Sequence, residues 1–169
     1  MQSIQQNLEK ILNRIQVSAE RRGRKKEEVT LVAVTKRHSA SEIAELKRLG
    51  IKIIGESRVQ ELEEKFTALK DDFEIHFIGH LQTNKVKQAV RMSHAIHSVD
   101  SLKVAAAIDE ECAKLNKKMD VLIQVNASLE PQKSGIAPDG LEALLTEAEP
   151  LVAQSAPAAV PQPRSGREG

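Results

Sequence analysis

The sequence predicts an α/β fold in which helices cover a parallel sheet. Short apolar runs of strand length alternate with segments whose apolar residues recur at helical spacing, and turn or capping residues separate them. The ends of the apolar runs recur roughly every 20–26 residues, a normal length for one strand–helix unit. Parallel strands need connections of this length, so the repeat favours a parallel sheet with right-handed crossovers.

A helix opens the chain and a strand follows it. Apolar residues recur at helical spacing over residues 4–19, where Ser3 and Gln6 match a capping box and Gly23 matches the helix end. The run 30–36 is apolar and rich in β-branched residues, which is typical of a buried strand.

The next unit repeats this alternation. A second helix is expected over 40–49, because Ser39 and Glu42 form a capping pair and Gly50 stands at the C-terminal end. The second strand is expected over residues 51–56.

The rest of the chain supplies three more strands and four more helices. Their expected order is a helix over 57–69, a strand over 74–80, a helix around 86–90, a strand over 95–100, a helix over 102–112, a strand over 121–126 and a helix over 138–148. The expected caps are Ser57 with Gln60, Thr83 or Asn84, and Asp100 or Ser101, with Pro138 in the first turn of the last helix.

A leading helix and five strand–helix units fit two architectures: an open doubly wound sheet, or part of a (β/α)8 TIM barrel. The loop 36–39 lacks the glycine fingerprint of a dinucleotide fold, and no phosphate-cradling G-x-x-x-x-G-K run occurs. We therefore expect the barrel, with about five of its eight units, over residues 1–150. Residues 151–169 are rich in Pro, Ala and Ser and are expected to be disordered.

The composition excludes several classes of protein. The net charge is +1 and the chain has three Phe, no Tyr and no Trp, so it lacks both a basic footprint and aromatic platforms for nucleic acid. No secretory signal or membrane-spanning run occurs, and we expect a cytoplasmic protein. The single cysteine, Cys112, lies in an apolar-periodic segment and is expected to be a small core residue.

Lys36 closes the first strand, at the edge of a parallel sheet where ligands bind. By alternation it shares a face with Val32 and Val34, which in a barrel places it at the mouth, above the inner layers. A lysine there can hold an anion, and a neutral amine can form a Schiff base with an aldehyde. The alternative is a lysine that extends from a strand end into water.

Other polar residues also stand near strand ends. His76 and His80 share a strand but lie too far apart along it to chelate a metal, so we expect no metal site. Ser57 and Ser98 lie at strand ends, where each also has an ordinary role as a helix cap. Lys133 follows the fifth strand near the same edge, and no Ser/His/Asp order or carboxylate pair indicates catalytic residues.

Five strings of residues stand at the five strand ends. They are Leu31–Lys36, Ile54–Glu61, His76–Lys85, Ile96–Ser101, and Val121–Asn126 followed by Lys133–Gly135. In their order and spacing, over roughly residues 5–148, the chain resembles the pyridoxal phosphate homeostasis proteins. The resemblance implies a barrel like the N-terminal domain of alanine racemase. It also implies that Lys36 carries pyridoxal 5′-phosphate (PLP) as an internal aldimine, with His76, Ser57 and Ser98 as pocket neighbours.

The resemblance also implies a function. Members of the family bind, buffer or deliver PLP, so the expected partners are PLP and PLP-dependent apoenzymes, and the expected state is a monomer. Burial at the barrel mouth is expected to lower the pKa of Lys36 from about 10.4 by desolvating its charged form. No acid or base clearly stands over a substrate carbon, so we expect a carrier rather than an enzyme. The alternatives are a PLP-dependent racemase-like isomerase and an inactive fragment.

The chain departs from the family in two places. Ser57 and Arg58 stand where the family has Asn and Tyr, and Ser57 can still make a hydrogen bond. After about residue 150 the family continues with the units that hold the phosphate, and here the Pro/Ala/Ser segment follows. On this reading we expect unpaired sheet edges, self-association and a lower affinity for PLP.

Overall fold

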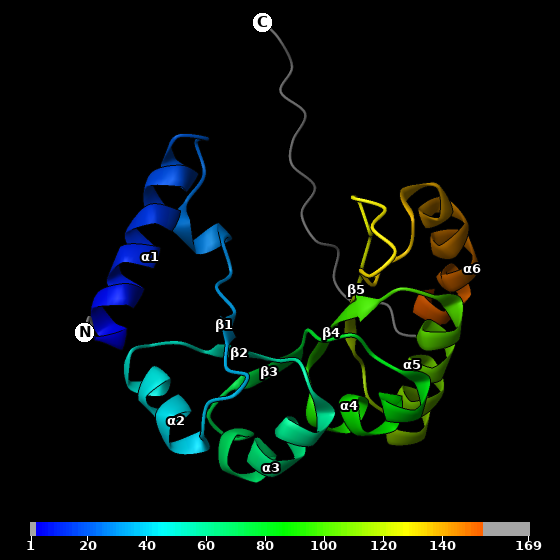
Figure 1. Cartoon of the computed structure of the whole chain (residues 1–169), viewed down its shortest axis with the longest axis horizontal. Helices are drawn as coiled ribbons and strands as arrows, with labels where there is room; N and C mark the ends of the chain where they lie inside the picture. Colours follow the sequence, from blue (N-terminus) through cyan, green and yellow to red (C-terminus); the bar gives the residue numbers. More distant parts are fainter. Residues whose placement is uncertain (1–2, 154–169) are drawn as a thin grey trace, which may run out of the picture.

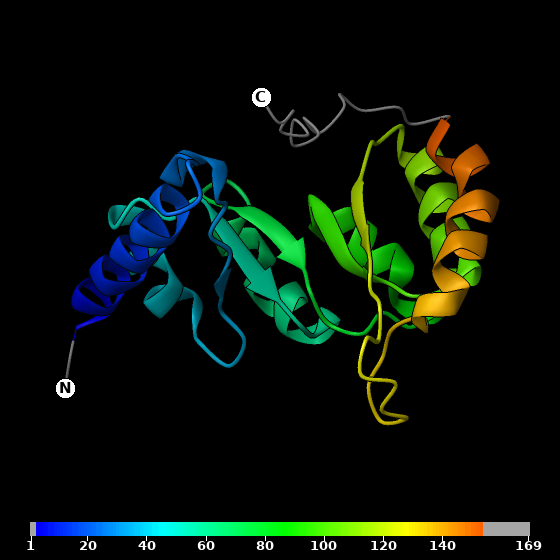
Figure 2. The same ribbon diagram turned by 90° about the horizontal axis from the view of Figure 1, so that it is seen from above.

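In the computed structural model, which describes residues 3–153, one parallel sheet runs through the molecule with helices along its outer side (Figure 1). Helices α2 to α5 form an arc around the strands, and α1 and α6 stand at the two ends of the molecule (Figure 2). The helices and strands are α1 (Ile4–Glu20), β1 (Ala33–Val34), α2 (Ala40–Arg48), β2 (Ile53–Glu56), α3 (Val59–Leu69), β3 (Glu74–Phe77), α4 (Val86–Met92), β4 (Ala95–Val99), α5 (Leu102–Leu115), β5 (Asp120–Ile123) and α6 (Leu141–Ala153). Three short 3-10 helices are η1 (Lys26–Glu28), η2 (Thr83–Lys85) and η3 (Pro138–Gly140).

The strand order decides between the two expected architectures. The sheet has the order β1-β2-β3-β4-β5, and every pair is parallel. A doubly wound sheet reverses its strand order at a switch point, whereas each strand of a barrel pairs with the next one along the chain. The barrel-type α/β fold is therefore confirmed, and the doubly wound sheet is wrong.

Several expected helix boundaries are confirmed and others are wrong. The capping boxes at Ser3 and Ser39 form, and the Ser101 side chain caps α5. The expected caps of α3 and α4 are wrong: the N-cap residue is Arg58 in α3 and Lys85 in α4, and neither makes a side-chain capping bond.

Other expected boundaries shift by a few residues. The strand expected over 30–36 is only Ala33–Val34, because β1 pairs on one side with β2 and the ladder sets its length. The last helix begins with η3, which carries Pro138 in its first turn, and continues to Ala153. Residues 151–153 of the segment expected to be disordered are thus helical, and the rest of it lies outside the described residues.

The core lies between the sheet and the helices. We call the sheet face of Ile54, Ile75 and Ile96 the outer face; all three side chains are fully buried. They pack in one cluster with apolar residues of α3, α4 and α5, and Cys112 belongs to it, which confirms its expected core position. The core is mainly aliphatic, as the low aromatic content predicts, and it also holds Phe73 and Phe77.

The opposite face of the sheet is open. We call it the inner face and define it by Val34, Gly55, His76 and His97, which share it through the pairing register and strand alternation. Val34 on β1 is 51% exposed, and Leu122 on β5 is 53% exposed. Within the described residues β1 and β5 each pair on one side only, as expected for the sheet edges.

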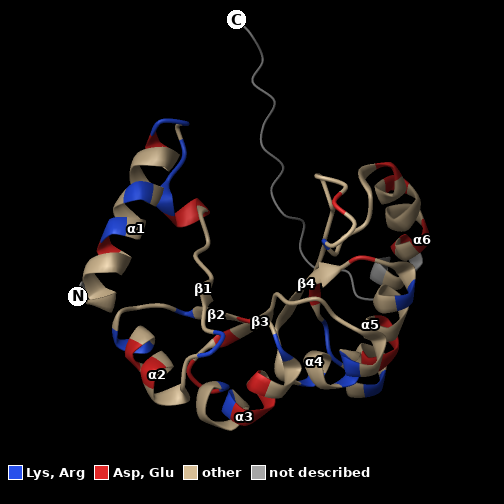
Figure 3. Cartoon of the chain, in the orientation of Figure 1, with Lys and Arg blue, Asp and Glu red and all other residues tan. Residues whose placement is uncertain are grey.

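Acidic and basic residues are mixed along helices α2 to α5 (Figure 3). This agrees with the near-neutral net charge of +1. Among the described residues, no helix has the length and apolar character needed to cross a membrane.

Candidate functional site

Lys36 lies at the carboxyl edge of the sheet, on the inner face. The backbone N–H of Thr35 donates to the carbonyl oxygen of Gly55 at 3.0 Å, which extends the pairing of β1 and β2 up to Lys36. The expected burial of Lys36 is wrong, since the side chain is exposed on the open inner face. Within residues 3–153 its amine has no hydrogen-bond or ion-pair partner, so it is available to a ligand.

Ser57 stands next to Lys36 at this edge. It follows β2 directly, and the continued register sets it beside Lys36 on one side and Ile78 on the other. The loop after β3 packs tightly on it: a Cβ at Gly79 would lie 2.0 Å from the Ser57 carbonyl oxygen. Only glycine fits there, and this contact fixes the backbone of Ser57 beside Lys36.

Two histidines lie deeper on the inner face. His76 is buried and stands two residues before Ile78 on β3, or about 7 Å below the row of Lys36 by strand rise. Its Nδ1 lies 2.9 Å from His97 Nε2, and its Nε2 lies 2.9 Å from Glu74 Oε1. In the neutral ring, Nε2–H of His76 donates to the Glu74 carboxylate and Nδ1 accepts from His97 Nε2–H.

The electrostatics of this pair favour neutral His97. Burial, and then the charge of His76, lower the pKa of His97. The sequence analysis singled out His76 and missed His97, although His97 belongs to the string at the end of β4. The missing signal was the cross-strand register, which sets the two rings 4.9 Å apart.

Ser98 is not brought to the same face. It alternates with His97 along β4 and is buried on the outer side of the strand. Its Oγ has no hydrogen-bond partner among the described residues. The structure therefore gathers Lys36, Ser57 and His76 on one face and leaves Ser98 apart from them.

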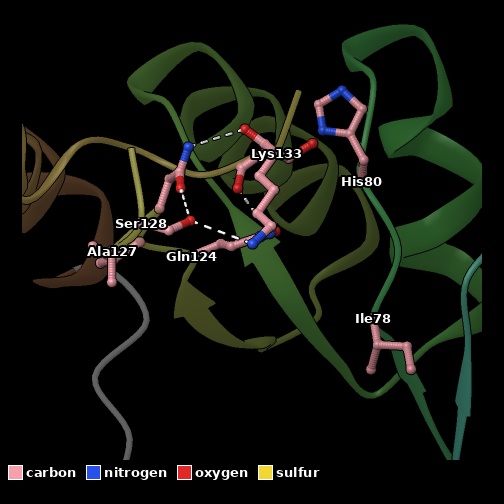
Figure 4. Close-up of a pocket in the computed structure, with 9 residues that line it drawn as sticks. Ile78, His80, Gln124, Ala127, Ser128 and Lys133 are labelled. Carbon is pink, nitrogen blue, oxygen red and sulfur yellow. Dashed lines mark hydrogen bonds between the residues drawn. The ribbon is translucent and has the colours of Figure 1, made fainter. Parts of the chain in front are cut away.

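A cavity of about 420 Å³ opens farther along the carboxyl edge, between the loops that follow β3 and β5 (Figure 4). Its lining residues are Ile78, His80, Gln124, Val125, Asn126, Ala127, Ser128, Lys133 and Ser134. Lys133 donates to Ser128 Oγ at 3.4 Å and pairs with Glu130. Lys36 does not line this cavity, and Ile78 connects the cavity to the row of Lys36.

The polar residues near this edge do not cluster as metal ligands do. His80 pairs with Asp100 at 3.5 Å, away from His76. Residues 3–153 contain no group of three or more His, Cys, Asp or Glu side chains placed to hold a metal ion.

Comparison with known proteins finds one matching family profile and several similar curated proteins. The profile of the family described as alanine racemase, N-terminal domain, matches residues 4–154. The chain is 42% identical over 140 residues to the pyridoxal phosphate homeostasis protein of Aquifex aeolicus, covering 82% of this chain and 61% of that protein. It is 37% identical to the protein of the same name from Escherichia coli K12, covering 80% of this chain and 60% of the relative.

Solved structures agree with the sequence comparison. PipY of Synechococcus elongatus without PLP superimposes with a TM-score of 0.71 at 35% identity, over 81% of this chain and 65% of that one. PipY with PLP bound gives a TM-score of 0.63 at 34% identity, over 83% and 64%. An alanine racemase of Clostridium difficile shares the fold, with a TM-score of 0.57 at 18% identity over 75% and 33%. The chain spans about three fifths of the length of the curated relatives it matches.

Proposed function

Because this chain belongs to the family of the alanine racemase N-terminal domain, in its pyridoxal phosphate homeostasis branch, we propose that it binds PLP through Lys36. The observation that carries the proposal is the place of Lys36. It stands two residues after β1, at the carboxyl edge of the sheet on the open inner face, and its amine has no partner within residues 3–153. Ligands of barrel proteins bind at this edge.

The residues at this edge fit the aldehyde end of PLP. Lys36 offers a primary amine and Ser57 a hydroxyl that can donate or accept one hydrogen bond. Gly55 lies one row below them on β2 and is covered, because a Cβ there would meet the side chains of Ile78 at 2.9 Å and Val32 at 3.2 Å.

PLP would supply an aldehyde, and the proposed attachment is a Schiff base with the primary amine of Lys36. A C=N bond would replace the C=O bond, and the carbonyl oxygen would leave as water with the two amine protons. Solvent on the open inner face would carry these protons from the nitrogen to the oxygen. Borohydride reduces the C=N bond to a stable amine, which makes the attachment measurable by mass.

We propose a carrier in vitamin B6 homeostasis rather than a catalyst. The relatives from Aquifex aeolicus and Escherichia coli carry the name homeostasis protein. The recipients of the cofactor would be PLP-dependent apoenzymes, which take it up by exchange of one amine for another at the aldehyde carbon.

A racemase-like isomerase is the second candidate, and one observation favours it. The chain Glu74–His76–His97 lies on the same face as Lys36 and could move a proton. The two candidates are separated by incubating the PLP-loaded protein with L-alanine or L-serine and following loss of optical activity. Racemisation that is lost in His76→Gln would favour the isomerase, and no racemisation would favour the carrier.

The attachment is tested by intact mass after treatment with PLP and borohydride. The matched variants are Lys36→Ala and Lys52→Ala, since Lys52 is an exposed lysine at the opposite end of the neighbouring strand β2. We expect one reduced adduct in the wild type and in Lys52→Ala, and none in Lys36→Ala. A folded wild type without an adduct, or an adduct kept in Lys36→Ala, would overturn the proposal and favour an inactive fragment or another lysine.

A further inference from the structure

A buried ion pair lies under Lys36, on the outer face. Glu56, the last residue of β2, is fully buried, and Lys65 of α3 is 8% exposed. Lys65 Nζ lies 3.0 Å from Glu56 Oε1. Burying two charges is costly, and apolar residues of similar volume often serve stability as well or better. The pair therefore calls for a role other than stability.

The pair holds the residue that precedes Lys36. Lys65 Nζ donates to the carbonyl oxygen of Thr35 at 3.2 Å, and the Thr35 hydroxyl donates to Glu56 Oε1 at 2.7 Å. Thr35 is itself buried, and its backbone N–H is bonded to Gly55. The Thr35 carbonyl oxygen also accepts from the backbone N–H of His38 at 3.2 Å, so the polar groups of Thr35 are held by β2, by α3 and by the turn itself.

The same network holds the residue that follows Lys36. The backbone N–H of Arg37 donates to Glu61 Oε2 at 2.8 Å, and the same carboxylate oxygen lies 3.6 Å from Lys65 Nζ. Arg37 has φ of +66°, in the left-handed region that costs a residue with a Cβ about 1–2 kcal/mol. A charge-assisted hydrogen bond from its N–H offsets that cost and selects this turn.

Strand pairing alone cannot fix this turn. β1 is two residues long and within residues 3–153 pairs with β2 only. Glu61 and Lys65 reach the backbone on the two sides of Lys36, and Glu56 binds the Thr35 hydroxyl and the Lys65 amine. Among the described residues, none of the three is bonded to the Lys36 side chain. We call these three residues the Lys36 clamp.

We propose that the Lys36 clamp fixes the backbone on both sides of Lys36 and so aims its amine along the inner face. Its three members act as positioning residues. The direction of the amine matters only if Lys36 binds an aldehyde, so the aiming role rests on the proposed function. The fixing of the backbone does not depend on that function. Misplacing a reacting group by about 1 Å can cost as much as 100-fold in rate.

The test compares Glu61→Ala with Glu61→Gln. Alanine removes the acceptor of the Arg37 N–H, whereas glutamine keeps a carbonyl oxygen in its place and should rescue the function. Glu63→Ala is the matched control, because Glu63 is exposed on the same helix. Lys65→Met removes the hydrogen bond to the Thr35 carbonyl oxygen. This variant is compared with the others only if its circular dichroism shows a folded chain.

Two readouts are measured, and one of them needs no cofactor. In Glu61→Ala we expect amide hydrogen exchange at Arg37 to rise by about tenfold or more, because the N–H loses its acceptor. We expect the rate of borohydride-trapped PLP addition at Lys36 to fall by about tenfold. Glu61→Gln and Glu63→Ala should stay within about twofold of the wild type in both readouts.

The outcomes separate the two proposals. Unchanged Arg37 exchange in Glu61→Ala overturns the clamp, whatever PLP does. Faster exchange with an unchanged addition rate overturns the aiming role. A wild type that forms no adduct counts against the proposed function, and exchange at Arg37 still decides whether the clamp exists.

Discussion

His97 Nε2, on β4, lies 2.9 Å from His76 Nδ1, on the neighbouring strand β3. Both rings lie on the inner face, below the row of Lys36. The bond links two strands through residues 21 positions apart in sequence. It ties the protonation of one ring to that of the other, because both nitrogens of the bond cannot carry a proton at once.

The first prediction concerns pH and stability. The pKa of His97 is lowered by burial and then by the charge of His76, so the folded chain binds this proton less readily than the unfolded chain. Neutral His97 contributes its full stabilisation above the unfolded-state pKa of about 6.5. This stabilisation is lost as pH falls from there through the lower folded-state pKa. We expect Tm to fall between pH 7.5 and 5, and to fall less in His97→Gln. Equal slopes for the two proteins would contradict this.

The second prediction concerns the Glu56–Lys65 pair. In Lys65→Met the fully buried Glu56 carboxylate loses its counter-charge, which is expected to cost about 3–5 kcal/mol of unfolding free energy. The double variant Glu56→Leu/Lys65→Met buries no charge and should recover most of that loss. Urea unfolding of the three proteins measures the difference. A double variant as unstable as the single one would show that the charge is not the cause.

The third prediction concerns Gly79. A Cβ there would lie 2.0 Å from the Ser57 carbonyl oxygen, and backbone cannot yield as a flexible side chain does. We expect Gly79→Ala to cost about 1–3 kcal/mol in unfolding free energy. Gly140→Ala is the control, since its Cβ would meet only the Ile136 side chain, at 3.1 Å. Equal losses in denaturant unfolding would mean that the close contact with Ser57 is not limiting.

The fourth prediction concerns the single cysteine. Cys112 is buried in the core, and burial raises the pKa of its thiol, so little thiolate is present or accessible at neutral pH. We expect no reaction with an aromatic disulfide reagent in the native chain at pH 7.5, and one equivalent in denaturant. Rapid reaction of the native protein would place Cys112 at the surface.

Much of the fold followed from local patterns. The apolar runs and their spacing predicted all five strands, and Ser3, Ser39 and Ser101 marked helix starts correctly because a capping bond joins residues three apart. The capping pattern failed at α3. There Glu61 accepts from Arg37, 24 positions away, and no local rule reports that bond.

The candidate site divides in the same way. Strand alternation placed Lys36 on one face with Val32 and Val34, and the strand-end motifs made His76 its expected neighbour. It could not find His97, whose role depends on the register between β3 and β4. The sequence also led us to expect a buried Lys36 at the barrel mouth, whereas the burial of this side chain depends on what covers the inner face.

The sequence by itself thus determined the order of elements and the lysine that follows the first strand, because hydrophobic period and capping act over a few residues. The strand order, which only the tertiary structure shows, decided for the barrel-type sheet. The tertiary structure alone decided that Lys36 is exposed, that His76 pairs with His97 and that α3 holds the turn around Lys36. These depend on contacts between residues about 20 to 30 positions apart. Only the packing of strands and helices brings such residues within hydrogen-bond distance.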